Sequence, residues 1–458
     1  MTSSLSFLEP ELMDVVRLFE GADALEISHA VRADGKSYIN RFTLEGKERV
    51  YTDEISDEDL HIFGEKSVLK RTAKRALYFL LSEYYRKTLP WGSLTGIRPT
   101  RLAYTRLEHG LDFRSFFDEL GVSRENTDLV ERVINAQKGV YEKRDGNVDL
   151  YVSLPFCPTR CSYCSFITAP IASTRKYIDD YLQAIGRELA EAKPLIKNLR
   201  SVYIGGGTPF ALEAEELERV LRAVAPLRTN GCEYTVEAGR PDVFTEEKLA
   251  LCKKYGVTRI CINAQSFSDR TLNAIGRKHT GRDVIAAFEM ARPFGFIINC
   301  DLIAGLTGES VQEFRESVTQ AIALAPENIT VHTLCLKKGA RLKEEVNSLG
   351  EEGLSEMIAF SRAKLTEAGY EPYYLYRQKY MAGAHENVGW TKKGCASTYN
   401  IDVMEEIADN LAVGANAVSK KLFFSESRIE RMGSPKDIPT YLNKVDKIIE
   451  DRKKLYLG

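Results

Sequence analysis

The sequence lacks the features of a membrane-spanning or secreted protein. It contains no apolar run of ~18 or more residues, so no membrane span is expected. The stretch from Met1 to Asp14 is polar and acidic, unlike a secretory signal. No internal repeat or low-complexity segment is present. With 44% hydrophobic and 28% charged residues, the composition is that of an ordinary globular protein.

The sequence also has little net charge. Its formal value of -2 at pH 7 argues against bulk attraction to nucleic acid or to an anionic membrane. We therefore expect no nucleic-acid partner. At 458 residues the chain is long enough for two or three domains.

A disulfide framework is absent as well. The chain has nine cysteines, an odd number, and six of them are scattered. This usage favours reduced thiols and a cytoplasmic protein over a disulfide scaffold. The remaining three lie together in one loop.

That loop contains Cys157, Cys161 and Cys164 in a C-x3-C-x2-C spacing. A [4Fe-4S] cluster usually takes four cysteines, so three thiolates leave one iron open for a ligand. A structural zinc ion would need a fourth ligand, and no other Cys or His lies close by in sequence. Buried small cysteines are a third alternative, but three in one short loop is dense for that role. The spacing favours an iron–sulfur cluster.

Residues 1–147 have a different character from the rest of the chain. Three short extended runs, with a turn at Asp34-Gly35, precede an amphipathic helical stretch, Lys66–Lys87. One face of that helix is basic, and we expect solvated surface there rather than a nucleic-acid site. The extended runs are Ala24–Arg32, Ser37–Leu44 and Lys47–Tyr51. The sequence predicts an α+β N-terminal domain over 1–147.

From Val148 onward, extended and helical runs alternate. The extended runs are Val148–Leu154, Ser201–Gly205, Glu233–Ala238, Arg259–Asn263, Phe296–Ile303 and Asn328–Leu334. Such alternation predicts βαβ units, a parallel sheet and an α/β fold class. We assign 148–335 to this core and 336–458 to a C-terminal region that ends in one charged helix, Pro435–Lys454.

Small and polar residues follow several of these strands. The motif Gly205-Gly206-Gly207-Thr208 follows the second strand, where glycine lets the backbone approach a ligand closely. Glu237 ends the third strand and Gln265 follows the fourth. Asp301 ends the fifth on a mostly apolar run, where an acid needs a partner. In a barrel of such units, chemistry lies at these C-terminal strand ends.

Together these motifs resemble the radical S-adenosylmethionine (SAM) superfamily. The lead-in YVSLPFC and the aromatic Tyr163 resemble the oxygen-independent coproporphyrinogen III oxidase family. The segments TGIRPTRL, from Thr95, and YRQKYMAGAHENVGW, from Tyr376, resemble its HemZ-type branch, the coproporphyrinogen dehydrogenases. The resemblance implies a partial (β/α)6 barrel with an α+β N-terminal domain and a C-terminal α/β extension.

The resemblance also implies cofactors and site residues. Cys157, Cys161 and Cys164 would hold a [4Fe-4S] cluster, with one or two SAM molecules bound beside it. SAM would contact the glycine motif, Glu237, Gln265, Arg277 and Asp301, with Tyr151 as a catalytic residue nearby. Arg240 is a possible carboxylate partner, whereas His279 is expected at the surface.

The implied reaction is oxidative decarboxylation in porphyrin and heme biosynthesis. A 5′-deoxyadenosyl radical would take a hydrogen atom from each of two propionates of coproporphyrinogen III, giving protoporphyrinogen IX. The partners would be a tetrapyrrole substrate and an electron donor such as flavodoxin or ferredoxin, and a monomer is expected. Candidate partners for the substrate carboxylates are Arg160, Lys337, Lys338 and Arg377.

Two positions depart from the well-known oxidase branch. That branch has a His where this chain has Ser153, and a fourth cysteine where it has Phe166. A Phe there resembles the HemW-type heme chaperones, whose HNxxYW motif is replaced here by a segment beginning at Tyr399. Either His385 or Tyr399 could substitute as a heme ligand. A heme chaperone therefore remains an alternative, as does a radical SAM methyltransferase or heme-opening enzyme acting on a related tetrapyrrole.

Overall fold

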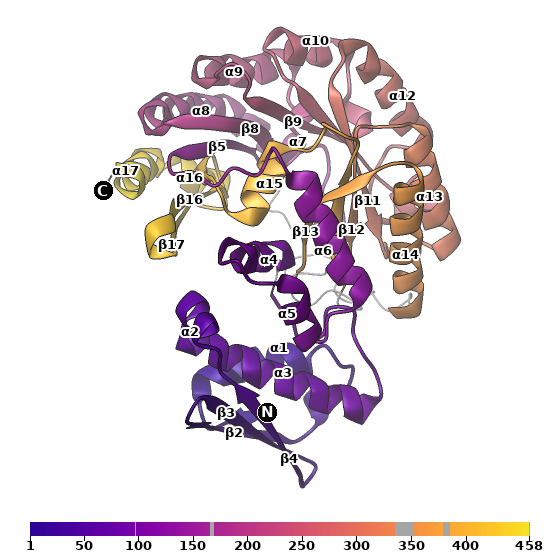
Figure 1. Ribbon diagram of the computed structural model, residues 1–458. Coiled ribbons are helices and arrows are strands. Elements are labelled where there is room, and N and C mark those ends of the chain that lie inside the picture. Colours follow the sequence, from indigo (N-terminus) through magenta and orange to yellow (C-terminus); the bar gives the residue numbers. More distant parts are fainter. Residues whose placement is uncertain (97, 165–168, 335–350, 379–384, 458) are drawn as a thin grey trace. The chain divides into compact units, whose positions relative to one another are not determined.

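The computed structural model describes residues 1–96, 98–164, 169–334, 351–378 and 385–457. The chain divides into two compact units, shown in Figure 1. Unit 1 comprises Met1–Ile134 and Leu375–Glu386, and unit 2 comprises Asn135–Tyr374 and Asn387–Gly458. Because unit 1 includes a short segment from late in the chain, the units are not consecutive in sequence. The predicted boundaries at residues 147 and 335 remain a prediction.

Unit 1 begins with a four-stranded sheet packed against helices. The strands, in the spatial order β1-β2-β3-β4, are β1 (Thr2–Ser3), β2 (Ile27–Asp34), β3 (Ser37–Leu44) and β4 (Lys47–Glu54). The helices are α1 (Glu9–Val16), α2 (Asp57–Phe63) and α3 (Glu65–Tyr85). Leu12, Phe42 and Leu77 lie in the shared core. The three predicted strands and the predicted long helix are confirmed. Helices α4 (Pro99–Glu108), α5 (Phe113–Glu119) and α6 (Arg124–Gln137) follow.

The basic face of α3 is paired with carboxylates of the same unit. Lys70 donates to Glu11 at 2.7 Å, and Arg71 forms an ion pair with Asp59. These two basic side chains are therefore engaged within the unit.

Unit 2 contains a large sheet built around six parallel strands. They are β5 (Asn147–Leu154), β8 (Asn198–Gly206), β9 (Glu233–Gly239), β10 (Arg259–Gln265), β11 (Ile297–Ala304) and β12 (Asn328–Thr333). They are neighbours in the order β12-β11-β10-β9-β8-β5, and each pair is parallel. All six predicted strands are confirmed. This sheet does not close and forms the partial (β/α)6 barrel.

Five helices follow one another around the outside of these strands (Figure 1). They are α8 (Ile178–Ala192), α9 (Ala214–Val224), α10 (Glu246–Lys254), α12 (Gly281–Ala291) and α13 (Val311–Ala323). Short-chain polar residues start several of them. Thr245 accepts from the Lys248 amide, and Thr280 and Ser310 each form a capping box. The short helices α7 (Ile171–Thr174) and α11 (Asp269–Ala274) lie in loops after β5 and β10.

The C-terminal region extends both ends of the same sheet. After α14 (Glu351–Glu367), the strands β13 (Glu371–Tyr376) and β14 (Asn387–Thr391) lie beyond β12. At the other end, β15 (Asp409–Val413) pairs in parallel with β5, and β16 (Val418–Phe423) and β17 (Arg428–Gly433) continue antiparallel. Along the sequence, α15 (Thr398–Glu405) lies between β14 and β15.

The predicted single tail helix is wrong. The chain forms two helices, α16 (Ile438–Leu442) and α17 (Val445–Leu457), and the first is capped at Asn443. In the part of the chain that the structure describes, no helix is long and apolar enough to span a membrane.

Candidate functional site

The three cysteines lie in the loop that leaves the C-terminal end of β5. Short strands β6 (Phe156–Cys157) and β7 (Ala169–Pro170) pair at its base. The amide of Ser162 donates to the Ile275 carbonyl at 3.0 Å, which ties the loop to the end of α11. The loop is therefore held on two sides.

The thiols are close enough to influence one another. Cys161 is buried, whereas Cys157 and Cys164 are partly exposed. Burial raises the pKa of the Cys157 thiol to about 11, and the negative charge of the other two thiols adds to the rise. A bound metal cluster reverses this preference, because a coordinating thiol is deprotonated by the positive charge of the metal.

This donor set suits a cluster better than a single ion. A single zinc ion takes four ligands at once, whereas the loop offers three thiols. Three neighbouring thiols instead suit separate iron corners of one [4Fe-4S] cluster. The residues present fit the predicted cluster.

The glycine motif at the end of β8 is bonded to the cysteine loop. The amide of Gly207 donates to the Leu154 carbonyl at 2.8 Å, and that of Thr208 donates to the Phe156 carbonyl at 2.7 Å. A Cβ atom on Gly205 would lie 2.6 Å from the Glu237 carboxylate, and one on Gly207 would lie 2.5 Å from a loop carbonyl. These glycines leave a narrow space that any side chain would fill.

Gly206 needs glycine for a different reason. Its φ is +99°, in a region that L side chains rarely adopt. A Cβ atom there would also lie 3.2 Å from the Tyr151 hydroxyl, so the predicted catalytic tyrosine sits beside the motif.

Glu237, at the end of β9, accepts hydrogen bonds from two neighbouring strands. Its carboxylate receives the Asn263 side-chain amide at 3.1 Å and the Tyr203 hydroxyl at 3.3 Å. Burial raises the pKa of Glu237 to about 7, and the negative charge of Asp301 contributes. The carboxyl therefore titrates in the physiological range.

Asp301 lies inside β11 rather than at its end, because the strand continues to Ala304, and its carboxylate remains charged despite its enclosure. Burial would raise its pKa, but hydrogen bonding and attraction to His332, with hydrogen bonds from Asn299 and Thr330, lower it overall. The Asn299 amide donates at 2.7 Å, and the His332 ring lies 3.8 Å away on β12. His332 was not predicted as a site residue.

Gln265 lies at an irregular point of β10. Its φ is +69°, and the pairing of β10 with β11 shifts register between Ile262 and Gln265. Its side-chain Oε1 is buried and has no hydrogen-bond partner among the described residues. A bulge next to such an orphaned acceptor is typical of strand ends that aim a side chain at a ligand.

Arg277 lies against the cysteine loop. It donates to the carbonyl of Asn263, and its interactions with Tyr163 and Cys161 outweigh burial and raise the pKa of the guanidinium. The arrangement places a fixed positive charge beside one predicted cluster ligand.

The prediction that His279 lies at the surface is wrong. Its side chain is buried, 3.9 Å from Asp242, and burial lowers its pKa to about 4. Arg240, predicted as a possible carboxylate partner, forms an ion pair with Asp242 at 2.6 Å and also donates to Thr159 in the cysteine loop.

Three tyrosines stack at the side of Glu237. The rings of Tyr203 and Tyr399 are 4.5 Å apart, and the Tyr151 ring lies 6.1 Å from the first and 6.3 Å from the second. Tyr203 also donates to Glu237. Because Tyr399 comes from α15, the C-terminal region contributes to the predicted site.

A partly buried carboxylate holds α15 in this position. Glu233, at the start of β9, accepts from the Ser397 hydroxyl at 2.8 Å and from the amides of Thr398 and Tyr399 at 3.0 and 3.2 Å. Arg259 also pairs with Glu233 at 3.2 Å. The negative charge at the N-terminus of the helix is favourable.

Other candidate residues lie elsewhere. In unit 1, Arg377 packs over the Trp91 ring and donates to the Leu94 carbonyl, while Trp91 donates to Glu386 at 2.8 Å. The Arg377 side chain therefore contacts other residues of unit 1, and His385 is buried in the same unit. Arg160 lies in the cysteine loop. The predicted positions Lys337, Lys338 and Phe166 fall outside the described residues, whereas Ser153 donates to the Ala415 carbonyl at 2.7 Å.

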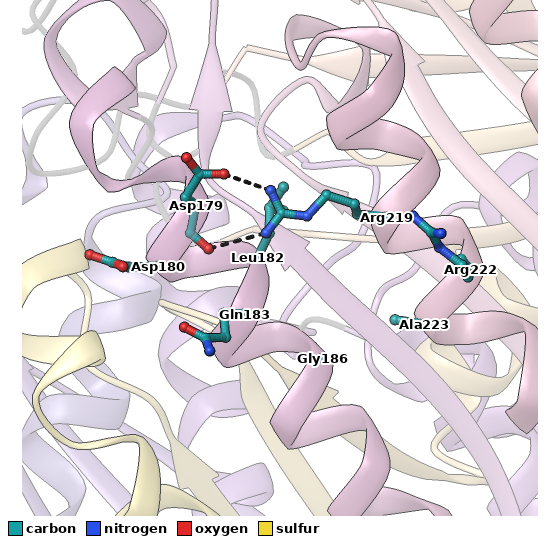
Figure 2. A pocket seen from close by; sticks show the side chains of 8 residues that line it. All are labelled: Asp179, Asp180, Leu182, Gln183, Gly186, Arg219, Arg222 and Ala223. Atoms are coloured by element: carbon teal, nitrogen blue, oxygen red, sulfur yellow. Dashed lines mark hydrogen bonds and ion pairs between the residues drawn. The ribbon is translucent and has the colours of Figure 1, made fainter.

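A hollow of about 440 Å³ lies outside the barrel, between α8 and α9 (Figure 2). Two of its opposite charges are paired with each other, since Arg219 donates to Asp179 at 2.6 Å. The hollow lies on the outer helices, whereas the predicted site residues lie at the strand ends, and it gives no indication of a ligand.

Comparison with known proteins identifies the family of the chain. A family model described as "Radical SAM superfamily" matches residues 151–321. "Oxygen-independent coproporphyrinogen-III oxidase-like protein HemZ" of Bacillus subtilis is 36% identical over 406 residues, covering 84% of this chain and 81% of that protein. "Heme chaperone HemW" of the same organism is 30% identical over 294 residues, covering 57% of this chain and 75% of that protein.

A solved structure shares the fold. It is described as "Coproporphyrinogen III oxidase (HemN) from Escherichia coli is a Radical SAM enzyme", and it superposes with a TM-score of 0.54 at 20% identity. The match covers 69% of this chain and 72% of that one. Because the HemZ relative is matched over most of both chains, the chain belongs to the radical SAM superfamily and, within it, to the HemN- and HemZ-like family.

Proposed function

We propose that the chain is a radical SAM enzyme of tetrapyrrole metabolism. Family membership implies a [4Fe-4S] cluster and SAM. In this proposal Cys157, Cys161 and Cys164 hold the cluster. The observation that supports it is the position of the residues predicted to contact SAM, which lie in the C-terminal halves of β8, β9, β10 and β11 or in the loops after them. These residues are Gly205, Gly206, Gly207, Thr208, Glu237, Gln265, Arg277 and Asp301.

The cofactors carry the difficult step, and the protein supplies binding, orientation and electrostatics. When bound, the cluster and SAM supply the one-electron chemistry that removes a hydrogen atom from the substrate. Glu237 and Asp301 would hold the positively charged ligand in place. Arg277 would balance the charge of the thiolates, and Tyr151 would limit the space beside the glycine motif.

The proposed reaction is oxygen-independent oxidative decarboxylation of coproporphyrinogen III to protoporphyrinogen IX. Each of two propionates loses a hydrogen atom, one electron and CO2 and becomes a vinyl group. A small reduced electron carrier such as flavodoxin or ferredoxin would supply the starting electron, and an oxidant would accept the final one. The name of the HemZ relative supports this substrate.

The test is anaerobic turnover of the reconstituted protein. We would incubate it with SAM, a reductant and coproporphyrinogen III, and identify the tetrapyrrole product by mass spectrometry. Two CO2 and one divinyl product per substrate are expected. SAM cleavage without CO2 release would rule out this substrate and favour methyl transfer or heme opening on a related tetrapyrrole. Tight heme binding without SAM cleavage would favour a heme chaperone.

The buried position of Tyr399 bears on the chaperone alternative. Its ring is stacked against Tyr203, and its enclosure raises the pKa of the hydroxyl well above the ordinary value. Heme ligation through a tyrosinate at this position would require the stack to open. The described structure therefore supports the enzyme over a chaperone that uses Tyr399.

We expect SAM affinity to depend on the charge of Glu237. Because its pKa is raised to about 7, the carboxyl is mostly neutral at pH 6 and mostly ionised at pH 8. SAM carries a sulfonium and an ammonium group, so its affinity should fall as the pH drops below 7, by up to ~10-fold per pH unit. Equilibrium binding to the cluster-loaded protein between pH 6 and 8 measures this.

The Glu237→Gln variant is the matched comparison for that measurement. It keeps the shape and can still accept from Asn263 or Tyr203, but it cannot ionise. Its SAM affinity should be lower at pH 8 and should lose this dependence. The same slope in both proteins would exclude Glu237 as the titrating group.

A further inference from the structure

The turn that follows Gln265 is unusually well held for a strained segment. Gln265 has a φ of +69° next to a bulge, a strained arrangement that persists only where the surroundings enforce it. The next residue, Ser266, is fully buried. The contacts that hold this turn come from the loop after β11 and from α13.

Ser266 is the centre of this arrangement. Its hydroxyl donates to the Glu309 carboxyl at 2.5 Å, lies 3.3 Å from the Ser317 hydroxyl, and accepts from the Ser268 amide at 3.1 Å. The Ser317 hydroxyl in turn accepts from the Phe267 amide at 2.9 Å. Hydrogen bonds to the Ser266 and Ser317 hydroxyls therefore hold the backbone after Gln265 in place. Glu309 in turn accepts from the Ser266 hydroxyl.

Glu309 is an unusual residue for this position. It is buried, one of its oxygens accepts from Ser266, and the other has no hydrogen-bond partner among the described residues. The nearest cation, Arg270, is engaged by Glu313 at 2.6 Å and by the Gly308 carbonyl at 2.5 Å. A carboxylate without its own cation is costly in such a place, so the uncharged acid is favoured.

We propose that Glu309 is a positioning residue for SAM binding. In its uncharged form it holds Ser266 in place through a hydrogen bond and thereby fixes the orientation of the Gln265 side chain. This inference rests on the proposed function, in which Gln265 contacts SAM. Glu309 itself touches neither the cysteine loop nor the glycine motif in the described contacts. It acts through the backbone of the turn.

The electrostatics of the surroundings agree with the geometry. Burial raises the pKa of Glu309 to about 8; the hydrogen bond from Ser266 and the charge of Arg270 oppose the rise, and the negative charge of Glu313 adds to it. The groups that face the carboxyl are thus Ser266, Glu313 and Arg270. Below pH 8 the acid is mostly neutral. Above pH 8, the cost of burying the charge and the repulsion by Glu313 outweigh the hydrogen bond from Ser266, so movement of the carboxylate toward solvent is favoured.

The test compares Glu309→Gln, Glu309→Ala and the control Glu316→Gln. Glutamine keeps an acceptor for Ser266 without ionising, whereas alanine removes the contact. Glu316 is exposed on α13, where it accepts from Gln312. Two measurements are made on each protein. One is the SAM dissociation constant of the cluster-loaded protein from pH 7 to 9.5, and the other is amide hydrogen exchange at Phe267 and Ser268 without SAM.

The wild type and Glu316→Gln should lose affinity above pH 8 by up to ~10-fold per pH unit relative to Glu309→Gln. The amino group of SAM titrates in all proteins alike, so the difference isolates Glu309. Glu309→Ala should exchange faster at Phe267 and bind SAM ~10-fold or more weakly at every pH. Identical pH profiles in the wild type and Glu309→Gln, or unchanged exchange in Glu309→Ala, would overturn the inference. Absence of SAM binding in the wild type would instead refute the proposed function.

Discussion

Cys161→Ala should lose the iron–sulfur cluster. The iron content should fall from about four atoms per chain toward zero, together with the broad visible absorbance of the cluster. We expect this loss because Cys161 is the most buried of the three cysteines and lies beside Arg277. Its loss leaves two partly exposed thiols, and SAM cleavage should drop to background.

A matched control separates cluster loss from general damage. Cys252 is fully buried on α10, and burial alone raises the pKa of its thiol to about 12. Cys252→Ala removes a thiol of the same size and should keep full iron content, as measured by iron assay and absorbance after anaerobic reconstitution. Full iron in Cys161→Ala would overturn the cluster assignment.

Glu188→Ala should be the most destabilising single change outside the site. Glu188, on α8, is fully buried. It forms an ion pair with Arg452 of α17 and accepts from the Tyr441 hydroxyl and from the Gly414 amide. Removing the carboxylate leaves Arg452 buried without its counter-ion, which typically costs about 3–5 kcal/mol. The midpoint of urea unfolding, followed by circular dichroism, measures the loss.

The same two helices provide the control. Glu191 and Lys453 form an exposed ion pair between α8 and α17, less than one turn from the buried one. Exposed pairs contribute at most about 1 kcal/mol, so Glu191→Ala should barely move the midpoint. The double variant Glu188→Met with Arg452→Met should recover much of the stability, because no buried charge remains. Equal effects of Glu188→Ala and Glu191→Ala would contradict this account.

The barrel could be predicted well because its signals are local. Each strand is a short apolar run bounded by helical periodicity, so the six predicted strands agree with the structure to within a few residues. The glycine motif and Glu237 could be placed at strand ends for the same reason. Parallel strands align their C-terminal ends, which brings residues far apart in sequence together without any further information.

What could not be predicted depends on contacts between distant segments. His332 is a single histidine on a strand, and only the neighbouring strand shows that it faces Asp301. His279 was expected at the surface, yet its side chain is buried and its ring lies 3.9 Å from Asp242. Tyr399 joins the stack because Glu233 holds the N-terminus of α15, a contact that spans more than 160 residues.

The parallel pairing of β5 with β15 has a consequence for biosynthesis. Val152 pairs with Val413, so one edge of the first barrel strand stays unpaired until 261 more residues have been synthesised. At roughly 5–20 residues per second, that interval lasts about 13–50 s on the ribosome. During this time β5 presents an unpaired edge, which is a template for unwanted strand addition. The nascent barrel therefore carries an exposed strand edge until β15 has been synthesised, and a chaperone that covers strand edges would act in that interval.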